Sequence, residues 1–157
     1  DWDIVRSVVE SVKVPVVPSG DICSPESAFL ARQAGAAALM IGRGALLNPW
    51  IFSEIELSGE KRQARKRTEV DVADVIEKYL VLLREELPDK AVIGRLKQFI
   101  CQVTKGLRGG AAVRRDLCTT PGLPDFMEQL ARWSDTVRSR TKMGPESLLW
   151  AGGSVDA

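Results

Sequence analysis

Two short apolar segments in the first third of the chain constrain its fold more than any other feature. Residues 14–17 (Val-Pro-Val-Val) and 37–41 (Ala-Ala-Leu-Met-Ile) each lead into a turn that contains glycine. Continuous apolar runs of this length are typical of strands that are covered on both faces, as in parallel sheets. Because helical patterns alternate with these runs, the order of the elements predicts a parallel α/β architecture.

Three helices are expected around the two apolar runs. Residues 3–12 place apolar side chains at helical spacing. Ser24 as the N-cap and Pro25 at the first helical position predict a second helix, which ends before Gly35. A short third helix is expected over residues 45–55, with a restart at Asn48-Pro49. These helices would cover the two predicted strands.

The local pattern changes near residue 60. Residues 58–68 are expected to be a basic linker, because they include the run Lys61–Arg67. Beyond the linker, apolar residues recur at helical spacing, which predicts an all-helical domain over residues 69–137. Its helices are expected at residues 70–86, 91–103, 111–117 and 123–133. A loosely ordered tail is expected over residues 138–157.

Charge is distributed unevenly along the 157 residues. The formal net charge is only +1 and 45% of the residues are apolar, which excludes disorder from low hydrophobicity and a globally polycationic nucleic-acid binder. Residues 1–60 carry a net charge of −4, residues 61–118 carry +6 and residues 119–157 carry −1. The basic middle indicates a polyanionic partner for the second half or, alternatively, the solvated faces of helices.

The sequence gives no reason to expect a membrane span or a metal site. The longest apolar run, residues 34–42, is far shorter than the about 20 residues that span a membrane. The chain has no histidine and no cluster with metal-ligand spacing, so we expect no metal. It opens without a basic and apolar leader and has three cysteines, so we expect a cytoplasmic protein. Cys23 is expected to be a packed thiol, and Cys101 and Cys118 are expected to belong to the core.

The two glycine turns are candidate anion sites. At the end of a parallel strand, backbone N–H groups and the positive end of the next helix dipole point at the same place. Gly20 and Gly42 would let the backbone approach a phosphate closely, and Arg43 could hold two of its oxygens. The alternative is that the glycines serve only the turns. Two such turns in succession, one with an arginine, favour the phosphate site.

Several segments together resemble the tRNA-dihydrouridine synthases. Three of them match that family in order, spacing and content: residues 14–22 (Val-Pro-Val-Val-Pro-Ser-Gly-Asp-Ile), 38–45 (Ala-Leu-Met-Ile-Gly-Arg-Gly-Ala) and 48–52 (Asn-Pro-Trp-Ile-Phe). Three more are similar to its C-terminal helical domain: residues 95–99, 105–109 and 113–115. The resemblance implies the last two strand–helix units of a (β/α)8 TIM barrel over residues 1–57, followed by a helical bundle domain.

The resemblance also implies a function and its residues. Members of this family are FMN-dependent oxidoreductases that use NADPH to reduce the C5–C6 double bond of uridine in tRNA. By resemblance, the phosphate and ribityl end of FMN would lie against Ser19, Gly20, Asp21, Gly42 and Arg43. Ser19 stands where the family usually has asparagine. The tRNA phosphates would lie against six basic residues of the helical domain: Arg95, Lys97, Lys105, Arg108, Arg114 and Arg115.

The family's catalytic cysteine is expected upstream of Asp1, because none of the three cysteines matches its position. The chain is therefore expected to be the C-terminal portion of such an enzyme, inactive by itself, and a monomer is favoured. Two alternatives remain open. One is another FMN-binding TIM-barrel oxidoreductase, such as a relative of dihydroorotate or ene reductases, against which the basic helical extension argues. The other is a non-catalytic RNA-binding remnant.

Overall fold

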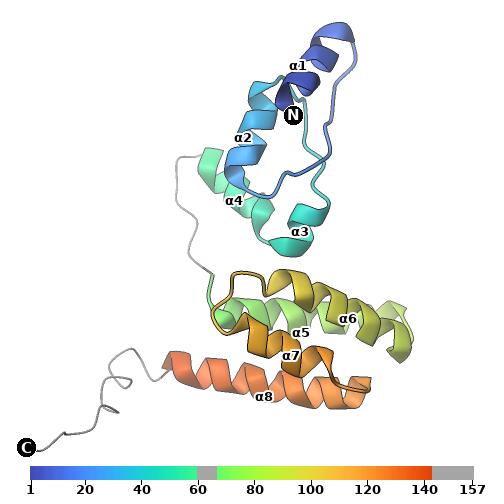
Figure 1. Cartoon of the computed structure of the whole chain (residues 1–157), viewed down its shortest axis with the longest axis vertical. Helices are drawn as coiled ribbons and strands as arrows, with labels where there is room; N and C mark the ends of the chain where they lie inside the picture. The colour runs from blue at the N-terminus through green and yellow to red at the C-terminus, as the bar shows by residue number, and fades with distance from the viewer. Residues whose placement is uncertain (60–66, 143–157) are drawn as a thin grey trace, which may run out of the picture. The chain divides into compact units, whose positions relative to one another are not determined.

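A computed structural model of the protein describes residues 1–59 and 67–142, and these residues form eight helices (Figure 1). The chain divides into two compact units, residues 1–66 and residues 67–157, which we call the first unit and the second unit. Most of the predicted basic linker, and the predicted tail beyond Lys142, lie outside the described residues. Each unit is described by itself below.

The first unit contains α1 (Trp2–Ser11), α2 (Pro25–Gln33), α3 (Arg43–Leu47) and α4 (Ile51–Gly59). Helix α2 contacts both α1 and α4, and α3 contacts α4. Ser24 caps α2 and Pro25 opens it, as predicted. The predicted restart at Asn48-Pro49 is also confirmed, since Asn48 Oδ1 accepts a hydrogen bond from the backbone N–H of Trp50 at 3.1 Å, just before α4 begins.

The predicted α/β architecture is wrong, because the described residues contain no strand. The two apolar segments do run parallel, and the backbone N–H of Met40 donates to Pro18 O at 3.1 Å. Within the described ranges they form one isolated parallel bridge, between Ser19 and Met40. Pro15 and Pro18 have no N–H, so the first segment cannot donate at these two positions and a regular ladder does not form. The expected strand–helix units of a TIM barrel are therefore not seen.

The core of the first unit is small. Its centre consists of the buried side chains Ile22, Ala28 and Ala31, with Trp2, Leu39, Ile41 and Ile55 packed against them and partly exposed. Helix α1 has no buried residue. Large apolar side chains of this unit remain exposed, among them Ile4, Val14, Phe29, Met40 and Phe52. The first unit therefore leaves much of its apolar surface in contact with solvent.

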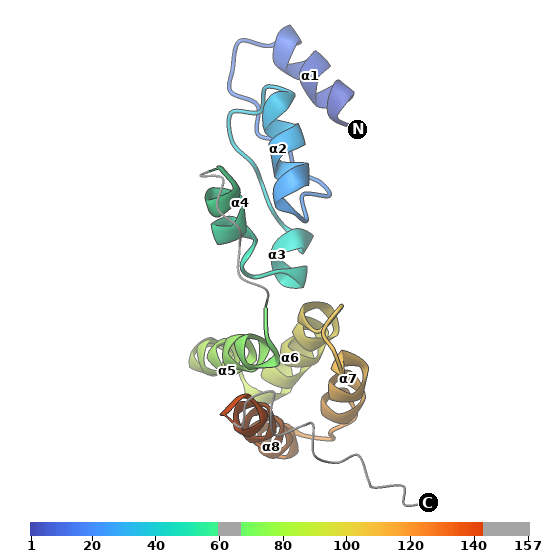
Figure 2. The ribbon, with the colours of Figure 1, turned by 90° about the vertical axis from the view of Figure 1, so that its left-hand side faces the viewer.

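The second unit is a bundle of α5 (Glu69–Glu86), α6 (Asp89–Val103), α7 (Gly110–Cys118) and α8 (Leu123–Lys142). Successive helices reverse direction (Figure 1). Helices α6 and α8 each contact the other three, whereas α5 and α7 do not contact one another. Figure 2 shows α5 and α7 on opposite sides of the unit.

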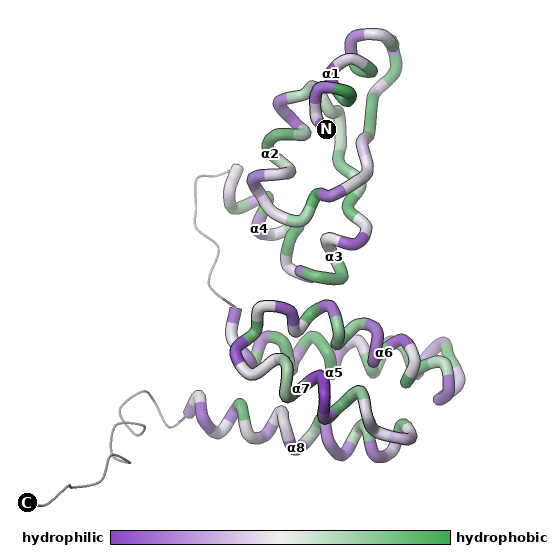
Figure 3. Tube along the Cα trace, in the orientation of Figure 1, coloured by the Kyte–Doolittle hydropathy of each residue, from purple (hydrophilic) through white to green (hydrophobic). Residues whose placement is uncertain are grey.

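The second unit has a continuous apolar core. Along α5, Val72, Ile76, Leu80 and Leu83 are buried, which is the spacing of one helix face. Helices α6 and α8, which both contact α5, also carry buried apolar side chains, including Leu96, Ile100, Phe126, Leu130 and Val137. Polar and apolar residues alternate along all four helices in Figure 3, as this spacing requires. Each such buried side chain contributes about 1.5–3 kcal/mol relative to exposure.

Helix α8 extends beyond the predicted end at residue 133 and continues to Lys142. Residues 138–142, which were expected to begin a loosely ordered tail, are therefore helical. Val137 is 1% exposed, and Arg138 binds Asp74 and Glu77 on α5, each at 2.7 Å. These long-range contacts stabilise the last turns of α8 against α5.

Candidate functional site

The two glycine turns of the first unit meet in one pocket of ≈ 200 Å³, which we call the glycine-turn pocket. It is lined by Ser19, Gly20, Asp21, Ile22, Cys23, Met40, Gly42, Arg43 and Gly44. All five residues that the resemblance places against FMN are among them. Drug-sized ligands usually occupy about 300–1,000 Å³, so this pocket has room for one end of a cofactor such as FMN.

Two glycines of the glycine-turn pocket have open space beside their backbone. No heavy atom lies within 4 Å of the position that a Cβ would take at Gly20 or at Gly42. Gly20 has a φ of +132° and Asp21 a φ of 49°, a region that aspartate tolerates better than most residues. The Arg43 guanidinium donates from Nη2 to Asp21 Oδ1 at 3.2 Å, and both side chains are exposed. A phosphate would therefore meet open backbone and one arginine that is already oriented.

Backbone donors at the start of α2 are already used by a capping box. Ser24 Oγ accepts a hydrogen bond from Ser27 N at 3.3 Å, while Ser27 Oγ accepts from Cys23 N and Ser24 N, each at 3.1 Å. This capping box uses the backbone donors that were expected to face a phosphate. Cys23, expected to be packed, is exposed at the edge of the pocket. Anion binding there depends on the glycines and on Arg43.

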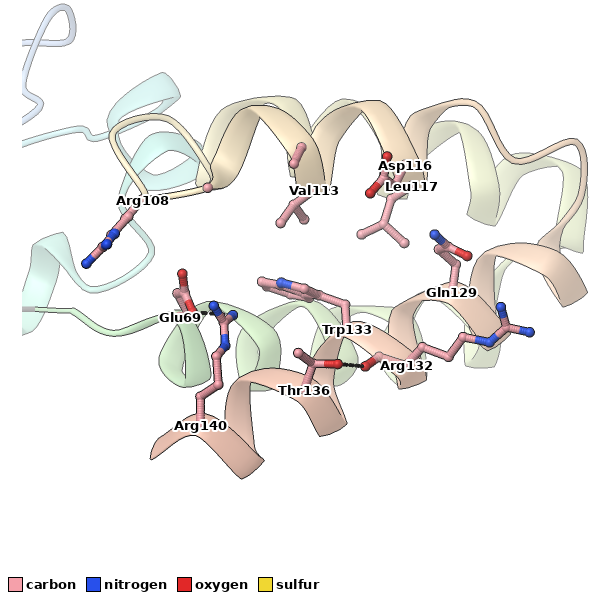
Figure 4. A pocket seen from close by; sticks show the side chains of 12 residues that line it. Glu69, Arg108, Val113, Asp116, Leu117, Gln129, Arg132, Trp133, Thr136 and Arg140 are labelled. Atoms are coloured by element: carbon pink, nitrogen blue, oxygen red, sulfur yellow. Dashed lines mark hydrogen bonds and ion pairs between the residues drawn. The ribbon is translucent and has the colours of Figure 1, made fainter. Parts of the chain in front are cut away.

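A second pocket, which we call the α7–α8 groove, lies in the second unit and has a volume of ≈ 340 Å³ (Figure 4). It is lined by Glu69, Arg108, Gly109, Ala112, Val113, Asp116, Leu117, Gln129, Arg132, Trp133, Thr136 and Arg140. In Figure 4 the indole of Trp133 extends into the groove toward Val113. Arg140 donates to Glu69 at 2.7 Å and Arg132 to Glu128 on its own helix. The groove thus combines an aromatic surface with arginines at its edge.

Two of the six basic residues predicted to bind tRNA each form hydrogen bonds with the end of a neighbouring helix. Lys97 Nζ donates to Thr120 O at 2.6 Å, beyond the end of α7. Arg114 Nη1 donates to both Thr104 O and Thr104 Oγ1 at 3.0 Å, at the end of α6. Both side chains are half-buried. Each therefore has a structural role within the bundle, whatever else it binds.

The other four predicted residues are exposed. Lys105 donates to Gln102 at 2.8 Å, and Arg115 Nε donates to the neighbouring Asp116 at 3.2 Å. Arg95 and Arg108 have no polar partner among the described residues. Arg108 is the member of the predicted set that lines the α7–α8 groove. The six residues thus belong to α6, α7 and the loop between them.

The α7–α8 groove includes side chains that the sequence reasoning did not select. Gln129, Trp133, Thr136 and Arg140 lie three or four positions apart and share one face of α8. The sequence shows this spacing along α8, but it does not show which residues lie opposite this face of α8 in the groove. Among the described residues there is no group of three or more acidic, cysteine or histidine side chains that could hold a metal ion. No helix in the described ranges is long and apolar enough to cross a membrane.

Comparison with known proteins identifies the class of protein. Residues 1–132 match the sequence profile described as dihydrouridine synthase (Dus). Because this match covers most of the chain, the protein belongs to the dihydrouridine synthase family. The resemblance found in the sequence is confirmed.

Individual relatives show how much of such a protein the chain represents. It is 47% identical over 68 residues to a probable tRNA-dihydrouridine synthase of Rickettsia conorii, which is 41% of this chain and 20% of the relative. It is 49% identical over 57 residues to tRNA-dihydrouridine synthase B of Shewanella oneidensis, 36% of this chain and 18% of the relative. A probable tRNA-dihydrouridine synthase of Rickettsia prowazekii is 30% identical over 149 residues, 90% of this chain and 44% of the relative. The chain spans less than half the length of each.

Proposed function

We propose that this chain is part of a tRNA-dihydrouridine synthase, in which the first unit holds the phosphate end of FMN and the second unit binds tRNA. Membership of the dihydrouridine synthase family supports the reaction class. The observation that carries the cofactor half is the glycine-turn pocket, because two turns distant in sequence bring their glycines and Arg43 to one place.

The chemistry that FMN supplies when bound is hydride transfer to the C5–C6 double bond of uridine, with NADPH as reductant. The residues of this chain bind and orient the cofactor. Gly20 and Gly42 let phosphate oxygens approach the backbone, and Arg43 donates charge-assisted hydrogen bonds to them. Asp21, which accepts from Arg43 Nη2, positions the guanidinium. Ser19 lines the same pocket and offers a hydroxyl.

The cofactor half is tested with Arg43→Ala. Loss of a charge-assisted hydrogen bond costs about 1.5–3 kcal/mol, so we expect FMN affinity to fall by about tenfold to a hundredfold. FMN binding is measured by the change in flavin fluorescence on titration with the protein. Arg6→Ala is the matched control, since Arg6 lies in the same unit on α1 and pairs only with Asp3 among the described residues.

Two outcomes would contradict the cofactor half. One is equal FMN affinity for the parent protein and Arg43→Ala. The other is a parent protein that binds no flavin while it binds tRNA, which would favour the alternative of a non-catalytic RNA-binding protein.

The tRNA half rests on the charge of the second unit. The described part of this unit, residues 67–142, carries a net charge of +3, and four more basic residues precede it, within residues 61–66 of the first unit. Arg95 and Arg108 are exposed and have no partner among the described residues, so phosphate contacts there would not compete with existing bonds. Lys97, Lys105, Arg114 and Arg115 would add their remaining N–H donors. Such contacts are typical of backbone recognition in nucleic acids.

The tRNA half is tested through the salt dependence of tRNA affinity, measured by fluorescence anisotropy at several salt concentrations. Each phosphate contact contributes about one unit to the slope of log K against log salt concentration. We expect Arg95→Ala and Arg108→Ala each to lower the slope by about that amount. Lys78→Ala is the control, because Lys78 is exposed on α5, on the side of the unit opposite α7. Unchanged slopes in both arginine variants would refute these contacts.

A further inference from the structure

Two cysteines of the second unit lie side by side in neighbouring helices. Cys101 is on α6 and Cys118 is the last residue of α7, and their Sγ atoms are 3.7 Å apart. Both were expected to belong to the core, yet Cys101 is exposed and Cys118 is half-buried. The pair is therefore close enough to react and accessible from solvent.

The geometry permits a disulfide with little rearrangement. A disulfide bond is about 2.05 Å long, so the two sulfur atoms have to approach by less than about 2 Å. Cys101 is exposed, so its side chain is not enclosed by the core. The helices that carry the two cysteines already contact one another, so their backbones need not separate or cross.

We propose that Cys101 and Cys118 form a thiol–disulfide site, at which a small disulfide such as oxidised glutathione links α6 to α7. The Cys101 thiolate attacks one sulfur of oxidised glutathione, which forms a mixed disulfide and releases one glutathione thiolate. The Cys118 thiolate then attacks Cys101 Sγ and releases the second glutathione. In balance, the two cysteines lose two protons and two electrons, and oxidised glutathione becomes two molecules of glutathione.

The surroundings of the pair determine the order of attack. Burial, followed by the hydrogen bond and charge of the neighbouring Cys101, raises the pKa of the Cys118 thiol to about 11. Cys118 is therefore a poor first nucleophile at neutral pH. Once Cys101 is a mixed disulfide, its thiol no longer opposes ionisation of Cys118; burial still raises the Cys118 pKa, and the positive charges of Lys97 and Arg114 still lower it. The exposed cysteine reacts first and the half-buried one resolves the mixed disulfide.

Two other roles for the Cys101–Cys118 pair fit less well: a disulfide with Cys23 and a metal site. Cys23 belongs to the first unit and has no cysteine beside it among the described residues. Two thiolates alone do not complete a tetrahedral metal site, and the described residues offer no third acidic, cysteine or histidine ligand near them. Oxidation to a disulfide needs only the two sulfur atoms and an acceptor.

The bond would stabilise the second unit. It closes a loop whose ends are 17 residues apart and which contains Arg108 and the loop between α6 and α7. Closing a loop of this size lowers the unfolding equilibrium constant by on the order of a hundredfold in the loop-entropy description. It also fixes the ends of the two helices that Lys97 and Arg114 already hold.

The test exposes the full chain to oxidised glutathione or to reduced glutathione, followed by acid quenching, alkylation and peptide mapping without reduction. We expect oxidised protein to yield a peptide pair joined through Cys101 and Cys118, and a higher urea midpoint than reduced protein. Cys118→Ser should stop at one glutathione on Cys101. Cys101→Ser should leave Cys118 largely reduced over the same time.

Two results would overturn the proposal. The first is a parent protein that accumulates only the mixed disulfide when it is incubated with oxidised glutathione. The second is a Cys101–Cys118 link found only between two chains, shown by mixing isotopically labelled and unlabelled protein. Both results are read from peptide mapping of the parent protein, so they do not depend on whether the serine variants fold.

Discussion

Gly44 is the position in the glycine-turn pocket that has no room for a side chain. A Cβ at Gly44 would lie 2.1 Å from Ile22 O, a backbone atom that cannot move away cheaply. Ile22 is 3% exposed and belongs to the small core of the first unit. Gly44 therefore determines how closely α3 approaches the segment that carries the first glycine turn.

We expect Gly44→Ala to destabilise the first unit by about 1–3 kcal/mol, the range for overpacking a well-fitted site. The measurement is urea unfolding followed by tryptophan fluorescence in a Trp133→Phe background, since Trp2 and Trp50 lie in this unit and Trp133 lies in the second unit. Gly42→Ala is the matched control, because the added methyl group meets no heavy atom within 4 Å. Equal urea midpoints for the two variants would show that the Gly44 contact is not restrictive.

For single residues, the sequence predicts local roles, such as a turn, better than it predicts which residues lie next to them in space. Gly20 and Gly42 could be recognised as turn residues, because glycine after an apolar run is a local signal. The special position of Gly44 could not, because it depends on the carbonyl group of Ile22, which the chain brings back from another segment. Cys101 and Cys118 were misjudged for the same reason: apolar neighbours in sequence indicated burial, while Cys101 is exposed and Cys118 is only half-buried.

Among the helices, α5 and α8 are joined by a small ionic network. The Arg138 guanidinium on α8 donates to Asp74 Oδ1 and to Glu77 Oε2, each at 2.7 Å, and to Glu77 Oε1 at 3.2 Å. Burial acts to raise the pKa of the Glu77 carboxyl, but the hydrogen bonds of Arg138 and Ser134, together with the charge of Arg138, outweigh burial, so this pKa lies below its ordinary value of 4.5. The Glu77 carboxylate and the Arg138 guanidinium thus favour their charged forms.

This network predicts a pH dependence of stability. Because the pKa of Glu77 is lower in the folded than in the unfolded protein, its contribution is fully present above about pH 4.5 and is lost as the pH falls through the folded value. We expect Glu77→Gln to cost up to about 1 kcal/mol near neutral pH, because the pair is partly exposed and screened. The difference between the parent protein and Glu77→Gln should shrink toward pH 3.

Thermal unfolding of the parent protein and Glu77→Gln at several pH values measures this effect. Glu128→Gln is the control, since Glu128 pairs with Arg132 within α8 and does not join two helices. A difference for Glu77→Gln that stays constant from neutral to acidic pH would contradict the ionic explanation.

Helices whose signals are local were predicted well. The spacing of Val72, Ile76, Leu80 and Leu83 is enough to identify α5, and Ser24-Pro25 is enough to start α2. The end of α8 was missed, because its last turns depend on Arg138 reaching α5. The prediction of two strands was wrong, because apolar residues indicate burial but do not guarantee a hydrogen-bonded ladder.

The two units of the molecule differ in how much apolar surface they bury. The second unit has a core that runs through all four helices, whereas the first unit buries mainly small side chains and leaves Ile4, Val8 and Phe29 exposed. Local stability follows buried apolar contacts, so the two units should open with different free energies.

We expect region-resolved hydrogen exchange to separate the two units. Backbone amides in residues 1–59 should exchange faster than those of α5 and α6, because fewer buried side chains protect them. Mass spectrometry of peptides after timed exchange gives both rates in one sample, so each unit is the control for the other. Similar protection in the two units would mean that the first unit has stabilising contacts beyond its small core.

Helix α5 begins with a capping box of its own. Thr68 Oγ1 accepts a hydrogen bond from Asp71 N at 3.2 Å, and Asp71 Oδ2 accepts one from Thr68 N at 2.7 Å. The start of the bundle is thus encoded within the bundle itself. Thr68 is therefore a natural junction for chimeric proteins: the helical unit of this chain can be grafted behind the first part of a relative with its leading helix turn intact.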